Sequence, residues 1–73
     1  MGAATMPPTV RLANEISRQF AHKAPEEAAT AVANHLKVAW DPRMKTALLA
    51  YVDAGGDELD PIAVRAAALL RAV

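Results

Sequence analysis

The sequence predicts an all-α fold, a compact bundle of four short helices. Three observations predict it. No segment alternates apolar and polar side chains with the period of two that marks a β-strand. Alanine, the strongest helix former, supplies much of the 53% hydrophobic fraction. Proline and glycine divide the 73 residues into four segments, and in each of them apolar residues recur at helical spacing.

The first helix is expected over residues 9–22, behind a flexible tail of residues 1–8. Thr9 is expected to be its N-cap, because a threonine hydroxyl can accept a hydrogen bond from the free N–H groups of the first turn. The apolar residues of the segment recur at intervals mostly of three or four and are expected to face the core. They are Val10, Leu12, Ala13, Ile16 and Phe20.

The second helix is expected over residues 25–38. Pro25 suits the first helical position, which needs no N–H partner, and two glutamates follow in the first turn, where the helix dipole favours negative charge. Small residues dominate the predicted inner face, so another helix can approach it closely. The predicted inner residues are Ala28, Ala29, Val32, Ala33, Leu36 and Ala39.

The third and fourth helices, over residues 42–54 and 61–72, share a start signal in which aspartate precedes proline. A glycine pair ends the third helix, as a left-handed C-cap requires. The expected cap and turn residues are Asp41, Pro42, Gly55, Gly56, Asp60 and Pro61. The expected core residues are Met44, Ala47, Leu48, Tyr51, Val52, Ile62, Ala63, Ala66, Ala67, Leu69, Leu70 and Val73. Short connections indicate one domain over residues 9–73.

The charge balance argues against several classes of partner. Eight basic and eight acidic residues give a net charge of zero, whereas nucleic-acid binders usually carry a basic excess. A helix-turn-helix can be drawn over residues 25–54, with Arg43 and Lys45 in its second helix, but Asp41 lies at the same end. No apolar run is long enough to span a membrane, and residues 1–6 lack the pattern of a secretory signal. We therefore expect a cytoplasmic protein that binds neither nucleic acid nor membrane.

No residue pattern points to catalysis, a cofactor or a metal. Without cysteine there is no disulfide and no thiolate metal site. His22 and His35 lack ligand partners at metal-site spacing, and Ser17 lacks a nucleophile elbow. The acidic residues around Gly55 and Gly56 do not have the spacing of a calcium loop. The chain is therefore expected not to be an enzyme, with no catalytic, cofactor-binding or metal-binding residues.

The segment from Trp40 to Met44 combines tryptophan, arginine and methionine, three residue types enriched in protein–protein interfaces. The alternative is structural: Trp40 would close the core and Arg43 would pair with a nearby acid. The residue types leave both interpretations open.

Several short motifs resemble the delta subunit of NAD-dependent formate dehydrogenases. They follow in order through the chain, over about residues 9–70: Arg11 to Ile16, Phe20, Asn34 to Lys37, Trp40 to Met44, Leu48-Leu49, Gly55-Gly56 and Leu59 to Pro61. Two positions depart from the family pattern. Tyr51 stands where a histidine is expected, and Val38-Ala39 replaces a basic–aromatic pair.

The resemblance implies a non-catalytic accessory subunit. Its partner would be the catalytic (alpha) subunit of a soluble formate dehydrogenase that carries the molybdenum cofactor, iron–sulfur clusters and FMN, and its role would be assembly, stability or maturation. A transient maturation chaperone and a small helix-turn-helix protein remain as alternatives, and a homo-oligomer of the isolated chain stays open. The expected partner-binding residues are Trp40, Arg43, Met44, Leu49 and Val64. Asp41 would cap a helix while Trp40 and Arg43 face outward.

Overall fold

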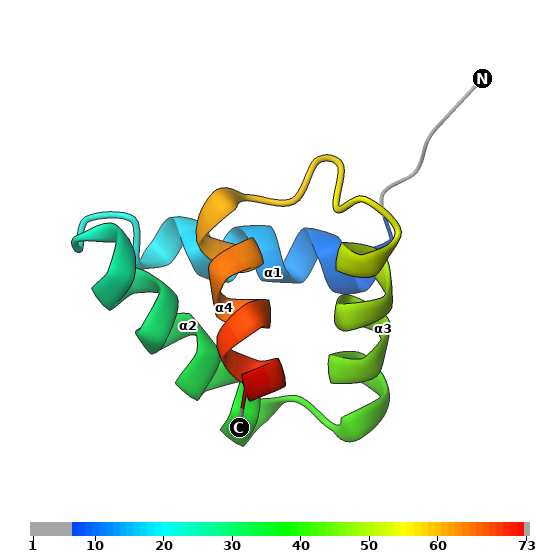
Figure 1. Cartoon of the computed structure of the whole chain (residues 1–73). Helices are drawn as coiled ribbons and strands as arrows, with labels where there is room; N and C mark the ends of the chain where they lie inside the picture. Colours follow the sequence, from blue (N-terminus) through cyan, green and yellow to red (C-terminus); the bar gives the residue numbers. More distant parts are fainter. Residues whose placement is uncertain (1–6, 73) are drawn as a thin grey trace.

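The computed structural model describes residues 7–72, which form four α-helices and no strand (Figure 1). The helices are α1 (Pro8–Gln19), α2 (Pro25–Ala39), α3 (Pro42–Asp53) and α4 (Pro61–Ala72). The prediction of an all-α bundle of four short helices is confirmed. The tail predicted for residues 1–8 lies outside the described residues apart from Pro7 and Pro8, and Pro8 already belongs to α1. The predicted core residue Val73 also lies outside them.

The helices α2 and α4 form a close pair, and α1 and α3 pack against this pair. These two run in the same general direction and make the most extensive helix–helix contact (Figure 1). The α3 helix lies on the other side of α4 and runs the opposite way, while α1 crosses behind the bundle. Within the described part of the chain, α2 and α3 barely contact each other, although they are consecutive.

The core is small because alanine makes up much of it. Leu36, Leu48, Val10 and Val32 are the largest apolar side chains that are fully buried. Each of the paired helices contributes three buried alanines: Ala28, Ala29 and Ala33 from α2, and Ala63, Ala66 and Ala67 from α4. Such short side chains allow α2 and α4 to approach closely, but each buries little apolar area.

The α1 helix begins one residue earlier than the sequence indicates, so the prediction of Thr9 as N-cap is wrong. Pro7 has extended backbone angles (φ −56°, ψ 147°) and occupies the cap position, with Pro8 as the first helical residue. The Pro7 carbonyl accepts hydrogen bonds from the N–H groups of Val10 and Arg11, at 3.0 and 3.1 Å. Proline suits the first helical position because its missing N–H would have no partner there.

The end of α1 also differs, at Gln19 instead of residue 22. The N–H of Phe20 bonds to the carbonyl of Ser17, and that of Ala21 to the carbonyl of Arg18. These three-residue steps tighten the chain into a turn and end the α-helix. The other boundaries differ from the prediction by at most one residue.

Some predicted core residues are exposed instead. On α1, Val10, Ala13 and Ser17 are buried, whereas Leu12 is 43% exposed. Leu12 and Ser17 are five residues apart, which places them about 140° apart around the helix axis. Three residues predicted to be in the core of the other helices are also exposed, because they lie on the side of the helix that faces away from the core. They are Ala39, Ala47 and Leu69.

The predicted caps of α3 and α4 are confirmed. The Asp41 carboxylate accepts a 3.0 Å hydrogen bond from the N–H of Met44, and the Asp60 carboxylate accepts one of 2.8 Å from the N–H of Ile62. Each aspartate thus satisfies a donor that the first turn of its helix leaves free.

A Schellman motif ends α3. The N–H of Gly56 bonds to the carbonyl of Tyr51, and the N–H of Gly55 to the carbonyl of Val52. Both glycines have positive φ, 127° for Gly55 and 66° for Gly56. The predicted glycine turn is therefore present.

Candidate interaction surface

Trp40 follows the last residue of α2 and closes the core. The residue is 7% exposed, and its backbone N–H donates a 3.0 Å hydrogen bond to the carbonyl of Leu36. The backbone of Trp40 is extended (φ −96°, ψ 139°), which ends the helix and directs the chain towards α3. The expectation that Trp40 faces outward is wrong, because the indole is the largest apolar group available to cover the ends of α2 and α3.

Arg43 and Met44 lie in the first turn of α3 and differ in exposure. Arg43 is exposed, whereas Met44 is half-buried and packs against the core. The turn is tied back to α2 by Lys45, whose ammonium donates to the carbonyl of Lys37 at 3.4 Å. Of the three residues of this segment that were expected to contact a partner, Arg43 is therefore the exposed one.

Leu49 and Val64 were also expected to contact a partner, and they lie elsewhere. Leu49 is half-buried in α3 and packs against the core, and Val64 is 37% exposed on α4. Leu49 follows Arg43 by six residues, so the two lie about 120° apart around α3. The five expected partner-binding residues therefore do not share one face of the molecule.

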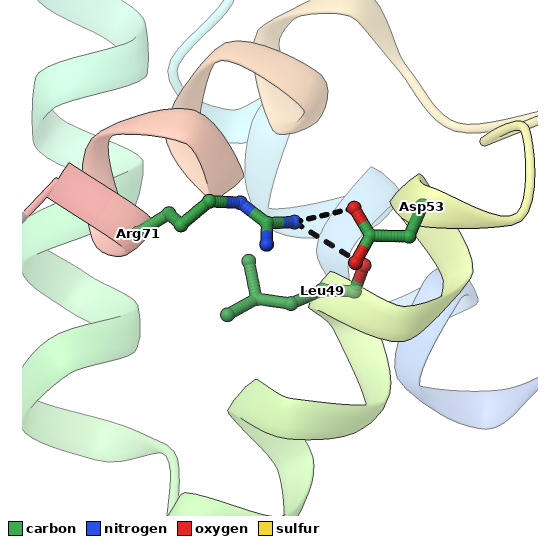
Figure 2. A network of polar contacts seen from close by, with 3 residues as sticks. All are labelled: Leu49, Asp53 and Arg71. Carbon is green, nitrogen blue, oxygen red and sulfur yellow. Dashed lines mark hydrogen bonds and ion pairs between the residues drawn. The ribbon is translucent and has the colours of Figure 1, made fainter.

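The end of α4 is tied to α3 near Leu49. The Arg71 guanidinium donates to the Asp53 carboxylate at 2.8 Å and to the Leu49 carbonyl at 3.5 Å (Figure 2). Both charged side chains are largely exposed, at 49% and 63%. A pair this exposed to water contributes less than about 1 kcal/mol, so it orients the helices more than it stabilises them.

Sequence reasoning missed a polar contact between α1 and the loop before α4. The Asn14 side chain accepts a 2.7 Å hydrogen bond from the N–H of Asp60 and donates one of 2.9 Å to the carbonyl of Glu58. The Tyr51 hydroxyl, on α3, also donates to this loop, at the carbonyl of Asp57. An asparagine in a helix gives no sign of a partner 46 residues away, so no local pattern could have revealed this contact.

The groups considered for chemistry are not gathered into a site. His22 is exposed in the turn after α1 and His35 is exposed on α2, and the buried Ser17 hydroxyl donates to the Ala13 carbonyl at 2.8 Å. Residues 7–72 contain no group of three or more histidine, cysteine, aspartate or glutamate side chains placed to hold a metal ion. No helix in that range is both long and apolar enough to cross a membrane.

Comparison with known proteins agrees with the resemblance in the sequence. The model of a family described as the NADH-dependent formate dehydrogenase delta subunit, FdsD, matches residues 9–67. The chain belongs to this family. The match includes the Trp40 to Met44 segment, the glycine turn and the first half of α4. Comparisons with curated proteins and with solved structures gave no match. As an FdsD family member, the chain is a subunit of a formate dehydrogenase complex and has partner subunits.

Proposed function

We propose that this chain is a non-catalytic accessory subunit of an NADH-dependent formate dehydrogenase, which supports assembly, stability or maturation of the molybdenum-containing catalytic subunit. The observation that carries this proposal is the family match over residues 9–67, since the matched family is named for a subunit of that enzyme.

The packing of the chain supports a role in association. Its largest fully buried side chains are two leucines and two valines, and α2 and α4 meet largely through alanine. Domains of this size gain only a small net free energy from their own core. Docking on a larger subunit supplies the additional buried apolar area that such a domain lacks.

We assign the cofactors of the complex to the partner subunits. A molybdenum centre and iron–sulfur clusters supply electron transfer when bound, and clusters are held mainly by cysteine thiolates. This chain has no cysteine, and its described residues contain no cluster of metal ligands, so its side chains do not fit such groups. Its proposed contribution is binding to the protein that holds them.

The expected partner contacts are revised by their exposure. We propose that Arg43 and Val64 contact the partner through their exposed side chains, with Met44 and Leu49 at the margins of the contact. Trp40 instead anchors the turn that presents Arg43, because its side chain is buried.

The test is a pull-down of the full chain against the catalytic subunit, prepared with and without its cofactors. Binding to the cofactor-loaded enzyme is expected for a resident accessory subunit. Binding to the cofactor-free form alone would replace that role with the transient maturation chaperone. Binding to neither form, nor to the other subunits of the complex, would overturn the proposed function.

A further inference from the structure

The net charge of zero hides an uneven distribution along α3. Residues 37–45, before and at the start of α3, contain three basic side chains and one acidic side chain. Residues 53–60, at its other end, contain four acidic side chains and no basic one. The two segments lie at opposite ends of α3, whose twelve residues span about 18 Å. The molecule therefore has one basic end and one acidic end along this helix.

We call residues 37–45 the basic junction, because they connect α2 to α3. Its single acid, Asp41, is engaged as the cap of α3 through the N–H of Met44. Lys37 and Arg43 are exposed, and within residues 7–72 neither forms an ion pair. Their charges are therefore available to a partner, and the net charge of the junction is positive.

The basic junction also exposes an apolar side chain. Val38 is 88% exposed, more than any other large hydrophobic residue among those described. It lies next to Lys37, and the half-buried Met44 lies at the other end of the junction. An exposed valine next to an exposed lysine, in a segment that also exposes an arginine, suits a contact that combines apolar burial with charge pairing.

The junction is held in one conformation before any partner binds. The Trp40 side chain is buried, Pro42 fixes its own φ angle at the start of α3, and Lys45 reaches back to the carbonyl of Lys37. Because the backbone between Lys37 and Lys45 is already ordered, docking there requires little additional loss of conformational entropy.

From these observations we propose that the basic junction docks an acidic, partly apolar segment of a partner subunit. Carboxylates of that segment pair with Lys37 and Arg43, the latter through two of its three guanidinium nitrogens, and an apolar side chain covers Val38. This inference rests on the proposed function, since it names one surface, and its chemistry, through which the accessory subunit binds its complex.

A second copy of the chain fits the junction less well, although its loop of residues 53–60 is acidic. Of its four acids, Asp53 already pairs with Arg71 and the Asp60 carboxylate accepts the N–H of Ile62, which leaves only Asp57 and Glu58 for the junction. Leu59, the large apolar residue of that loop, is only 8% exposed and cannot cover Val38.

Nucleic acid also fits poorly. The acid Asp41 lies within the junction, and α2 and α3 make little contact in the described structure. The two helices of a helix-turn-helix motif instead form a compact unit in which the second helix enters the major groove.

The test compares two double charge reversals in the full chain. The junction variant carries Lys37→Glu and Arg43→Glu. The control carries Arg11→Glu and Arg18→Glu, which make the same change in net charge on the exposed side of α1. Circular dichroism and thermal melting show whether each variant keeps its fold. A neutral pair, Lys37→Gln with Arg43→Gln, replaces the reversal if the latter unfolds.

The dissociation constant is measured against formate dehydrogenase purified without this subunit, at low and high salt. We expect the junction reversal to weaken binding at least about tenfold and to reduce its salt dependence, while the control changes binding less than about threefold. Equal losses in both variants, or no loss in the junction variant, would overturn the inference and leave the proposed function intact.

Two further outcomes would also overturn the inference. The first is that the wild-type chain binds duplex DNA and the junction reversal abolishes this binding. The second is that the wild-type chain forms a concentration-dependent oligomer and the junction reversal abolishes it. In either case the junction would bind a ligand other than a partner subunit. Failure of the wild-type chain itself to bind the enzyme would instead remove the proposed function.

Discussion

The side-chain oxygen of Asn14 accepts a 2.7 Å hydrogen bond from the backbone N–H of Asp60, 46 residues later in the chain. The amide nitrogen of the same side chain donates to the carbonyl of Glu58. One asparagine thereby binds the loop before α4 at two backbone positions and fixes it against α1.

Replacing Asn14 by alanine is expected to destabilise the fold by about 1–3 kcal/mol, because the partly buried N–H of Asp60 loses its acceptor. Urea unfolding followed by circular dichroism measures the change. Gln19→Ala is the control, since Gln19 is an exposed residue of the same helix. If both variants unfold at the same urea concentration as the wild type, the two bonds of Asn14 add nothing measurable to stability.

Gly55→Ala is expected to cost more than Gly56→Ala, although both glycines have positive φ. At Gly56 the φ of 66° is accessible to other residues at about 1–2 kcal/mol, and an added Cβ would make ordinary contacts of 3.7 and 3.8 Å with Val52. The φ of 127° at Gly55 lies outside that region and is essentially restricted to glycine. Thermal unfolding shows which variant has the lower melting midpoint. A lower midpoint for Gly56→Ala than for Gly55→Ala would contradict the prediction.

Glu58→Gly is expected to stabilise the protein by up to about 1 kcal/mol. Glu58 has a φ of 68°, and a residue with a Cβ pays a steric cost there that glycine avoids. The greater freedom of glycine in the unfolded chain offsets part of this gain. The neighbouring exposed substitution Asp57→Gly is the control, and chemical denaturation of both distinguishes relief of strain from a general effect of glycine. A destabilisation equal to that of the control would show that no strain is relieved.

Trp40→Ala is expected to destabilise the fold by about 3–5 kcal/mol, because the indole is buried. For a domain of this size, with a total stability of roughly 4–11 kcal/mol, that is a large fraction. Loss of partner binding in this variant would therefore report unfolding. Trp40→Phe should retain the helical spectrum with a lowered melting midpoint, and an unchanged midpoint for Trp40→Ala would show that the side chain does not support the core.

Substitutions at Val10 and Leu12 test which side of α1 is buried. Val10→Ala is expected to cost about 2 kcal/mol, since the side chain is 1% exposed, whereas Leu12→Ser should change stability by less than about 0.5 kcal/mol. Unfolding curves for the two variants provide the comparison. The reverse order would mean that Leu12, and not Val10, lies on the buried face of α1.

Local signals predicted most of the fold. The starts at Pro42 and Pro61 follow from the preceding aspartates, and the end of α3 follows from its two glycines, because each of these residues acts within a few positions of its own. The prediction was wrong where two local signals competed. The tail predicted for residues 1–8 ends at Pro7-Pro8, although Pro8 is well suited to start α1.

Burial was harder to predict than helix position. On α1 the apolar spacing predicted that Leu12 is buried, but the packing of the other helices buries Ser17 instead. The Ser17 hydroxyl donates a hydrogen bond to the Ala13 carbonyl. The candidate surface shows the same limit. The residue types around Trp40 left a structural and an interface interpretation open, and only the packing shows that its tryptophan is buried and that the neighbouring Val38 is exposed.

The alanine contact between α2 and α4 has a thermodynamic consequence. Burial of small side chains gives a small enthalpy and heat capacity of unfolding, for 73 residues at most about 50 kcal/mol and about 1 kcal/mol/K respectively. The melting transition should therefore be broad. Each kcal/mol gained or lost should move its midpoint by about 4–8 °C. Because a ligand that binds only the folded state adds to its stability, even modest occupancy by a partner should appear as a rise in melting temperature.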